Sequence, residues 1–270
     1  MIGEALVPDL AATRAGPPSP WLAVHDPAAP AGPPPAPVVG LGLVDQLLRD
    51  RGAVLARIDR GVALAALTRT FVVTIVVATA VAGAALGGFR GGVQIAYAAI
   101  KLPLALLVTA ALCGPALTAL GLALGRPAAL ARDLALVVAA LALGALVLAA
   151  LVPVLLMARA VDLDYHRSIL LVVGAGGLAA LAALAVLGRG AWRASPRAAA
   201  ALLALFAAVF VVVGAQVGWT LRPWLVRPRT PEVPFVRAVE GSLFDAVLGS
   251  ARSARGIYLR DAAPLPEVWP

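Results

Sequence analysis

Charged residues are scarce in this chain. Only 13% of its 270 residues are Asp, Glu, Lys or Arg, whereas 61% are hydrophobic. A soluble domain has about 25% charged residues. So much apolar surface cannot be buried in one soluble core, so the composition excludes an ordinary soluble protein and indicates that lipid is part of the solvent.

Cysteine and histidine are almost absent. The single cysteine, Cys113, lies in an apolar run and cannot form an intrachain disulfide. The sequence has no Gly-x-Ser-x-Gly, no His-Glu-x-x-His and no P-loop, and no aspartate lies deep in an apolar run. We therefore expect no enzyme activity, no catalytic residue and no cofactor.

One short polar segment has the residue types of a metal site. Asp162, Asp164 and His166 alternate in the chain, and carboxylate and imidazole groups are common metal ligands. Their side chains share one side only if the segment is extended, and no further acidic or histidine cluster completes the ligand shell. We expect a solvated loop and no bound metal.

Lysine is nearly missing as well, yet the chain is basic. The net charge of +8 is carried by arginines and by the single lysine, Lys101. These cations are scattered at the ends of apolar runs, with no basic patch interleaved with aromatic residues, so nucleic acid is not an expected partner. Arginines at such positions meet lipid headgroups, and membrane lipids are the expected partners.

The sequence contains several long apolar runs. Each is long enough, at about 20 residues, to cross a bilayer as a helix. We expect spans at about 63–87, 102–124, 134–158, 168–188 and 198–221. The sequence therefore predicts an all-α fold, a polytopic transmembrane helix bundle of about five spans over residues 63–221, with short amphipathic helices beside it.

Two segments precede the bundle. Residues 1–38 are rich in proline and alanine, and because proline blocks helix interiors we expect a disordered or polyproline II tail. Residues 39–62 have a helical period, with an apolar face that only Arg51 interrupts. Two interpretations of this amphipathic helix stay open: it lies in the membrane interface before the first span, or it packs on the protein's own spans.

The remaining segments are more polar. Residues 88–101 are too short and too polar to span, and we expect a connector or a short interfacial helix there. Residues 222–270 are expected to form a soluble C-terminal tail. In this tail Ser242 and Asp245 fit a helix-capping pattern that begins a short amphipathic helix.

Four polar or aromatic residues are the candidates for a functional role. Lys101, Trp219 and Arg222 are expected at helix ends, where they anchor spans to headgroups. Gln216 is the only strongly polar side chain well inside a predicted span, and a hydrogen bond between helices explains it. Anchoring and a shared binding role both remain open for this group.

The charge distribution gives only weak evidence for the orientation of the chain in the membrane. Five spans place the two ends of the bundle on opposite sides, and the loops on the two sides carry similar numbers of basic residues. A cluster of arginines before and at the start of the first span favours a cytoplasmic N-terminus, whereas the arginines of the C-terminal tail oppose it. We expect the N-terminus in the cytoplasm.

Two blocks of sequence carry a resemblance. They are residues 91–115, GGVQIAYAAIKLPLALLVTAALCGP, and residues 214–223, GAQVGWTLRP, the latter followed by Phe235-Val-Arg and Gly241-Ser-Leu-Phe. Both blocks resemble those of bacterial multi-pass inner-membrane proteins of unassigned function. More remotely, five spans behind a proline-rich tail are similar to the Yip family of membrane-trafficking proteins. The resemblance implies a non-enzymatic inner-membrane protein and brings no catalytic residue.

These observations favour one function over another. The leading hypothesis is a non-catalytic scaffold or adaptor that binds protein partners through its tails and amphipathic helices, or organises the bilayer. The alternative is a transporter or permease subunit, because glycine and proline interrupt spans two and four. Five spans in one chain allow no even internal repeat, so a transporter would have to form a homo-oligomer.

Overall fold

A computed structural model describes residues 40–161, 165–222, 224 and 235–236. All regular secondary structure in these residues is α-helical. Five helical stretches are long and apolar enough to cross a membrane, namely 64–87, 93–123, 130–160, 170–194 and 199–220. The prediction of an all-α, multi-pass helix bundle is confirmed.

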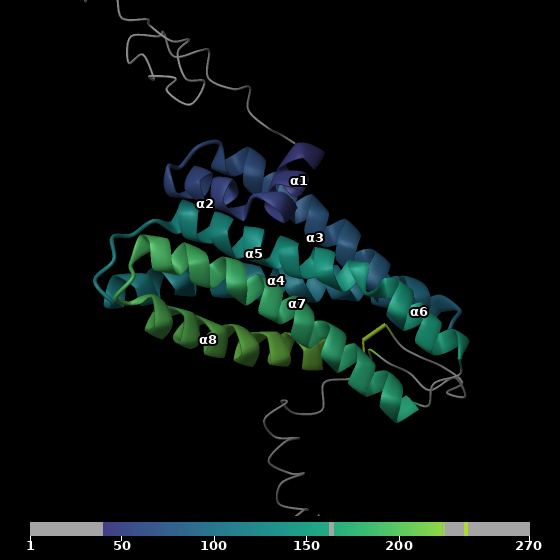
Figure 1. The fold of residues 1–270 in the computed structure, drawn as a ribbon. Helices are drawn as coiled ribbons and strands as arrows, with labels where there is room; N and C mark the ends of the chain where they lie inside the picture. The colour runs from purple at the N-terminus through teal and green to yellow at the C-terminus, as the bar shows by residue number, and fades with distance from the viewer. Residues whose placement is uncertain (1–39, 162–164, 223, 225–234, 237–270) are drawn as a thin grey trace, which may run out of the picture. The chain divides into compact units, whose positions relative to one another are not determined.

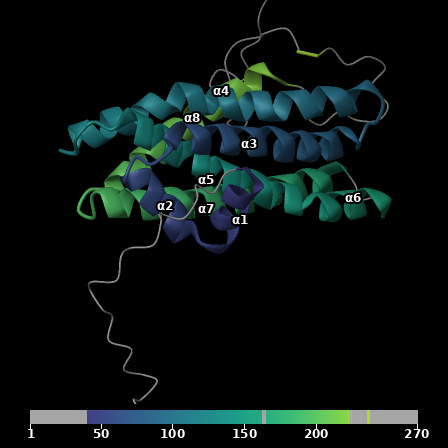
Figure 2. The ribbon, with the colours of Figure 1, turned by 90° about the horizontal axis from the view of Figure 1, so that it is seen from above.

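The spans follow one another up and down (Figure 1). In chain order they are α3 (Leu64–Gly87), α4 (Val93–Ala123), α5 (Leu130–Ala150) continued by α6 (Val152–Ala160), α7 (Tyr165–Ala194) and α8 (Ala199–Thr220). Helix α3 packs on α4 and α5, α7 packs on α5, and α8 packs on α4 and α7 (Figure 2). Helix α5 is therefore central, and α8 lies at the edge.

The amphipathic segment 39–62 forms two helices where the sequence predicted one. They are α1 (Leu41–Arg49) and α2 (Arg51–Asp59). The break is at Asp50, whose carboxylate accepts a hydrogen bond from the backbone N–H of Ala53 at 3.0 Å and so caps α2. Within α2, Arg51 still lies on the same face as Val54, Leu55 and Ile58, but it is the first residue of the helix and only half-buried.

The apolar faces of α1 and α2 are buried on the protein's own spans. Leu43 and Leu47 of α1 and Val54, Leu55 and Ile58 of α2 are at most 2% exposed. They join the core formed with α3, α5 and α7. The structure thus has the second of the two predicted arrangements, and a location in the membrane interface stays a prediction.

Helix α4 begins earlier than the sequence predicted. We expected a connector over residues 88–101, but the helix starts at Val93, directly after Gly91 and Gly92, whose φ angles are positive. The polar residues of this stretch do not face lipid, because Gln94 and Lys101 are buried. The helix continues through Pro103 and Pro115, each of which removes one backbone hydrogen bond.

Two other boundaries differ from the predicted ones. The third span, expected at 134–158, is divided at Leu151 into α5 and α6, where Pro153 occupies the first turn of α6. The fourth span, expected at 168–188, extends as α7 to Ala194. Several predictions lie outside the described residues: the tail 1–38, Asp162, Asp164, the side chain of His166, and the helix after Ser242.

Candidate functional site

Lys101 is the first of the predicted candidates, and its expected position was wrong. The structure places it inside α4, eight residues after the start, with 0% of its surface exposed. Its ammonium group lies 5.1 Å from the centre of the Phe235 ring and 6.0 Å from that of Tyr97. These two rings meet edge to face at 5.1 Å. Aromatic faces attract a cation at such distances, which offsets part of the cost of burying it.

Trp219 and Arg222 meet at the end of α8, where the sequence predicted them, and their role as anchors of the last span stays a prediction. The guanidinium of Arg222 lies on the ring of Trp219 at 3.7 Å. Arg222 Nη2 is buried and has no hydrogen-bond partner among the residues that the structure describes. A buried donor without a partner has a desolvation cost, which an anionic acceptor would offset.

The ends of α4 and α8 are joined by further hydrogen bonds. The side-chain amide of Gln94 donates to the backbone carbonyl of Trp224 at 3.2 Å, and Trp224 Nε1 donates to the carbonyl of Gly218 at 2.8 Å. Gln216, the fourth candidate, is half-buried one turn before the end of α8. All four predicted residues thus lie in one region, where the first turns of α4 cross the last turns of α8.

A buried ion pair joins α4 and α5 on the other side of the bundle. Arg126 Nη2 lies 2.5 Å from Asp133 Oδ2, and the two side chains are 6% and 4% exposed. The hydroxyl of Thr118 donates to the same carboxylate oxygen at 2.8 Å. Removing one partner of such a pair leaves an uncompensated buried charge, so the pair fixes the two helices relative to each other.

The end of α4 positions Arg126. The backbone N–H of Arg126 donates to the carbonyl of Gly121, and that of Gly125, at a φ of 79°, donates to Leu122. This pair of bonds is the Schellman motif that ends many helices. A Cβ on Gly121 would lie 2.8 Å from Arg126 Nε, so glycine leaves the space for the guanidinium.

Sequence reasoning missed this ion pair. We expected no aspartate deep in an apolar run, and neither Arg126 nor Asp133 was among the candidate residues. The available signal is the spacing of Thr118, Arg126 and Asp133, which lie before, within and after one short turn. Opposite charges in a turn and in the helix that follows it can meet, because the turn brings them close together.

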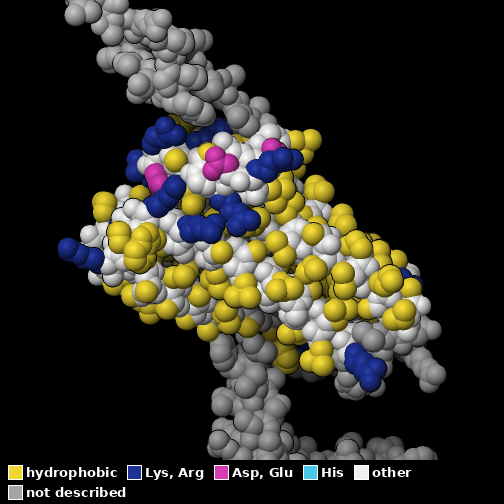
Figure 3. Space-filling model, in the orientation of Figure 1, with side chains coloured by type: hydrophobic (Ala, Val, Ile, Leu, Met, Phe, Trp, Pro, Cys, Tyr) yellow, Lys and Arg dark blue, Asp and Glu magenta, His cyan; other side chains and the backbone are white. Residues whose placement is uncertain are grey.

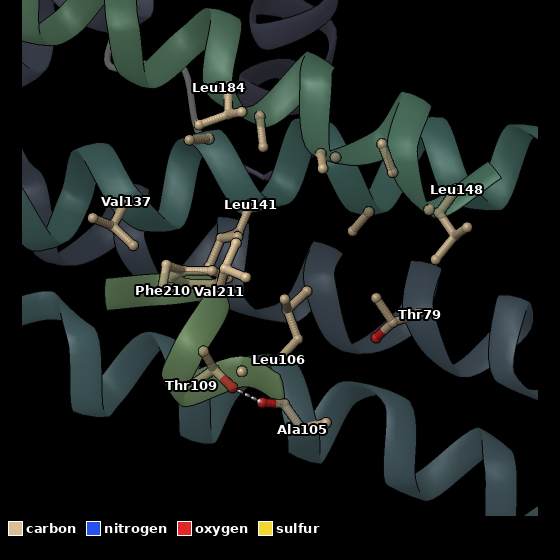
Figure 4. A pocket seen from close by; sticks show the side chains of 18 of the residues that line it. Thr79, Ala105, Leu106, Thr109, Val137, Leu141, Leu148, Leu184, Phe210 and Val211 are labelled. Atoms are coloured by element: carbon tan, nitrogen blue, oxygen red, sulfur yellow. Dashed lines mark hydrogen bonds between the residues drawn. The ribbon is translucent and has the colours of Figure 1, made fainter. Parts of the chain in front are cut away.

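An elongated apolar cavity lies between α4, α5, α7 and α8, with Thr79 of α3 at one end (Figure 4). Its volume is about 420 Å³, within the range of about 300–1,000 Å³ of ligand pockets. Leu106 and Thr109 of α4 and Phe210 and Val211 of α8 project into it. Sequence analysis gave no sign of this cavity, because its walls are alanine, leucine, valine and glycine like the rest of the spans.

The chain matches no protein-family model, no curated protein and no solved structure. The resemblances to bacterial inner-membrane proteins and to the Yip family gain no support from these comparisons. Of the three features described, the apolar cavity is the one that offers space for another molecule, because Lys101 and the Arg126–Asp133 pair are buried.

Proposed function

We propose that this chain is a non-catalytic scaffold or adaptor of the bacterial inner membrane. Its bundle would hold α1 and α2 at the membrane surface, and these helices would bind acidic surfaces of partner proteins. The observation that carries the proposal is the α1–α2 unit itself, which is fixed on one face and charged on the other.

The charged face of the α1–α2 unit supports the binding of partner proteins. Arg49 and Arg60 are exposed on α1 and α2, and Arg132 and Arg193 are exposed beside them at the ends of α5 and α7. Arg193 donates to the carbonyl of Gly52 at 3.0 Å, which ties α2 to α7. Figure 3 shows arginines gathered over α1 and α2 together with a few acidic side chains, above flanks covered by hydrophobic side chains.

The same face also has a recess that could hold a side chain of a partner. It lies between α2 and α7, has a volume of about 460 Å³, and is lined by Arg51, Arg189, Trp192 and Arg193. Arginine forms paired hydrogen bonds with carboxylates and is enriched in the buried parts of interfaces, as is tryptophan. The recess is therefore suited to an acidic side chain of a partner.

The arginines that precede the first span support a cytoplasmic α1–α2 side. Arg49, Arg51, Arg57, Arg60 and Arg69 lie before α3 or in its first turns. Basic residues near span ends are enriched in the cytoplasm. The arginines of the C-terminal tail, which follow the last span, oppose this orientation, so the proposed cytoplasmic N-terminus rests on the cluster before the first span.

Crosslinking in native membranes tests the proposal. We expect crosslinked partners to be lost when Arg49 and Arg60 are both replaced by glutamate, because the reversed charge repels an acidic surface. The matched control replaces Arg159 and Arg167, exposed on the opposite side, and should keep the partners. Equal crosslinking patterns for wild type and both double variants would contradict the proposal.

A second candidate function is favoured by the cavity. A transporter needs a site between its helices, and this cavity provides one for an apolar or amphiphilic molecule but not for a polar solute, because its walls are hydrocarbon. Movement of fluorescent lipid between leaflets of proteoliposomes tests this function. Rates equal to those of protein-free vesicles would exclude lipid transfer and leave the scaffold proposal untouched.

A further inference from the structure

The shape of the apolar cavity is the starting point. Its lining runs from Val137 to Leu148 along α5 and from Phe206 to Gly218 along α8. At 1.5 Å per residue these stretches are about 16 and 18 Å long. The cavity is thus a slot parallel to the helices, and its length is about half of the 30 Å hydrocarbon core of a bilayer.

The wall of the slot offers hydrocarbon alone. The hydroxyls of Thr79 and Thr109 donate to the carbonyls of Ile75 and Ala105 in their own helices, at 2.6 and 2.7 Å. The indole N–H of Trp224 is bonded to Gly218. An engineered apolar cavity of about 150 Å³ stays dry and takes up benzene. A larger apolar slot in a membrane protein has the same preference for hydrocarbon.

The slot opens between α7 and α8. Gly176, Ala180 and Val211 line it and are also exposed, Val211 by 66%. A side chain added at Gly176 would meet no atom within 4 Å, so the space beside this glycine is free of protein. Because α7 and α8 are spans, what lies outside this opening is the lipid bilayer.

One end of the slot reaches the basic and aromatic residues at the crossing of α4 and α8. Leu102, Gly218 and Trp224 line that end, and Lys101 and Trp219 are their neighbours in the chain. Arg222 lies on Trp219 there with the unpartnered Nη2 described above. Arg222 does not line the slot, but it lies two residues from Trp224 and on the ring of Trp219, beside that end. An apolar slot with a cation beside one end matches an amphiphile with an apolar chain and an anionic head.

We propose that the slot holds one hydrocarbon chain of an anionic phospholipid. The lipid belongs to the leaflet on the side opposite α1 and α2, and its phosphate accepts hydrogen bonds from Arg222. The chain of this lipid fills the space that α7 and α8 leave open. The inference is independent of the scaffold proposal, which rests on the other side of the bundle.

Native mass spectrometry of the full chain tests the inference. The protein is released from nanodiscs that contain equal amounts of phosphatidylglycerol and phosphatidylcholine. We expect the wild type to retain one phosphatidylglycerol. In the Gly176→Leu variant the leucine enters the slot, and the bound lipid should be lost. The matched control is Gly174→Leu on the same helix, because Gly174 also has no neighbour within 4 Å but does not line the slot.

The headgroup is tested separately. In the Arg222→Gln variant the preference for phosphatidylglycerol over phosphatidylcholine should fall about tenfold, the loss expected for a charged hydrogen bond, while one lipid stays bound. Equal lipid retention by the Gly176→Leu and Gly174→Leu variants would overturn the inference. So would a protein that emerges as a dimer without lipid and becomes monomeric in Gly176→Leu, since a second copy would then fill the slot.

Discussion

The crossing of α3 with α4 and the gap between α7 and α8 are built from the same residue types but packed differently. At the first, Gly83 and Gly87 lie against the backbone of α4 at Ala98 and Gln94, with no room for a Cβ. At the second, Gly176 lines the slot, and Gly174 and Gly177 lie elsewhere on α7; none of the three has a neighbour within 4 Å of a Cβ. Glycine serves close contact in one place and leaves open space in the other.

Hydropathy does not distinguish these two regions. The apolar windows of α3 and α8 have mean hydropathies of 2.1 and 2.5, yet 44% of the first is buried in the protein and 11% of the second. In a bilayer, lipid-facing and protein-facing surfaces are both apolar, so association depends on close packing and on polar contacts between helices. The comparison can be tested by substitutions that act on one region and spare the other.

The largest effect is expected for Asp133→Ala, which breaks the buried ion pair between α5 and the turn after α4. The substitution leaves Arg126 buried without its partner and should destabilise the protein by about 3–5 kcal/mol. Unfolding of the reconstituted protein by denaturant measures the loss. The double variant Arg126→Met with Asp133→Leu removes both charges and should regain most of the stability. A double variant as unstable as the single one would contradict the ion-pair explanation.

A smaller effect is expected for Gly87→Val at the α3–α4 crossing. The added side chain would overlap the carbonyl of Gln94 and the backbone of Ile95, and such overpacking costs about 1–3 kcal/mol. The same substitution at Gly174 should change the free energy of unfolding by less than about 0.5 kcal/mol, because nothing lies beside it. Equal losses at both sites would show that the two regions do not differ in packing.

The smallest effect has the opposite sign. Gly174→Ala and Gly177→Ala should each stabilise the protein by about 0.5–1 kcal/mol, because alanine loses less backbone entropy than glycine in a helix and meets no neighbour at these positions. Thermal unfolding in detergent measures the gain. A loss of stability in either variant would mean that these glycines contact another molecule in the membrane.

The number of spans could be predicted from the sequence, because a helix that crosses a bilayer needs a long apolar run and few other structures satisfy the backbone in lipid. The start of α4 could not be predicted in the same way, because the hydropathy of residues 88–101 does not show on which face of a helix their polar side chains lie. Gln94, Tyr97 and Lys101 are spaced by three and four residues and share one face of a helix. That spacing was the available signal for a helix with a protein-facing polar side.

The candidate site was predicted in part. Lys101, Gln216, Trp219 and Arg222 were selected as polar residues near apolar runs, and they do lie at one crossing. Hydropathy could not reveal the slot beside them, because a cavity depends on how helices are placed and not on which residues they contain. The break at Asp50 was equally hidden, since the aspartate fits an exposed helix face as well as a helix cap.

The ion pair between α4 and α5 has a consequence for how the chain enters the membrane. Arg126 is synthesised before Asp133, and a lone arginine moved out of water carries a large cost of desolvation. That cost is offset only when α5 follows and brings its carboxylate to the turn. The burial of Arg126 is therefore coupled to the arrival of α5, and we expect the turn after α4 to reach its final packing only once Asp133 has been synthesised.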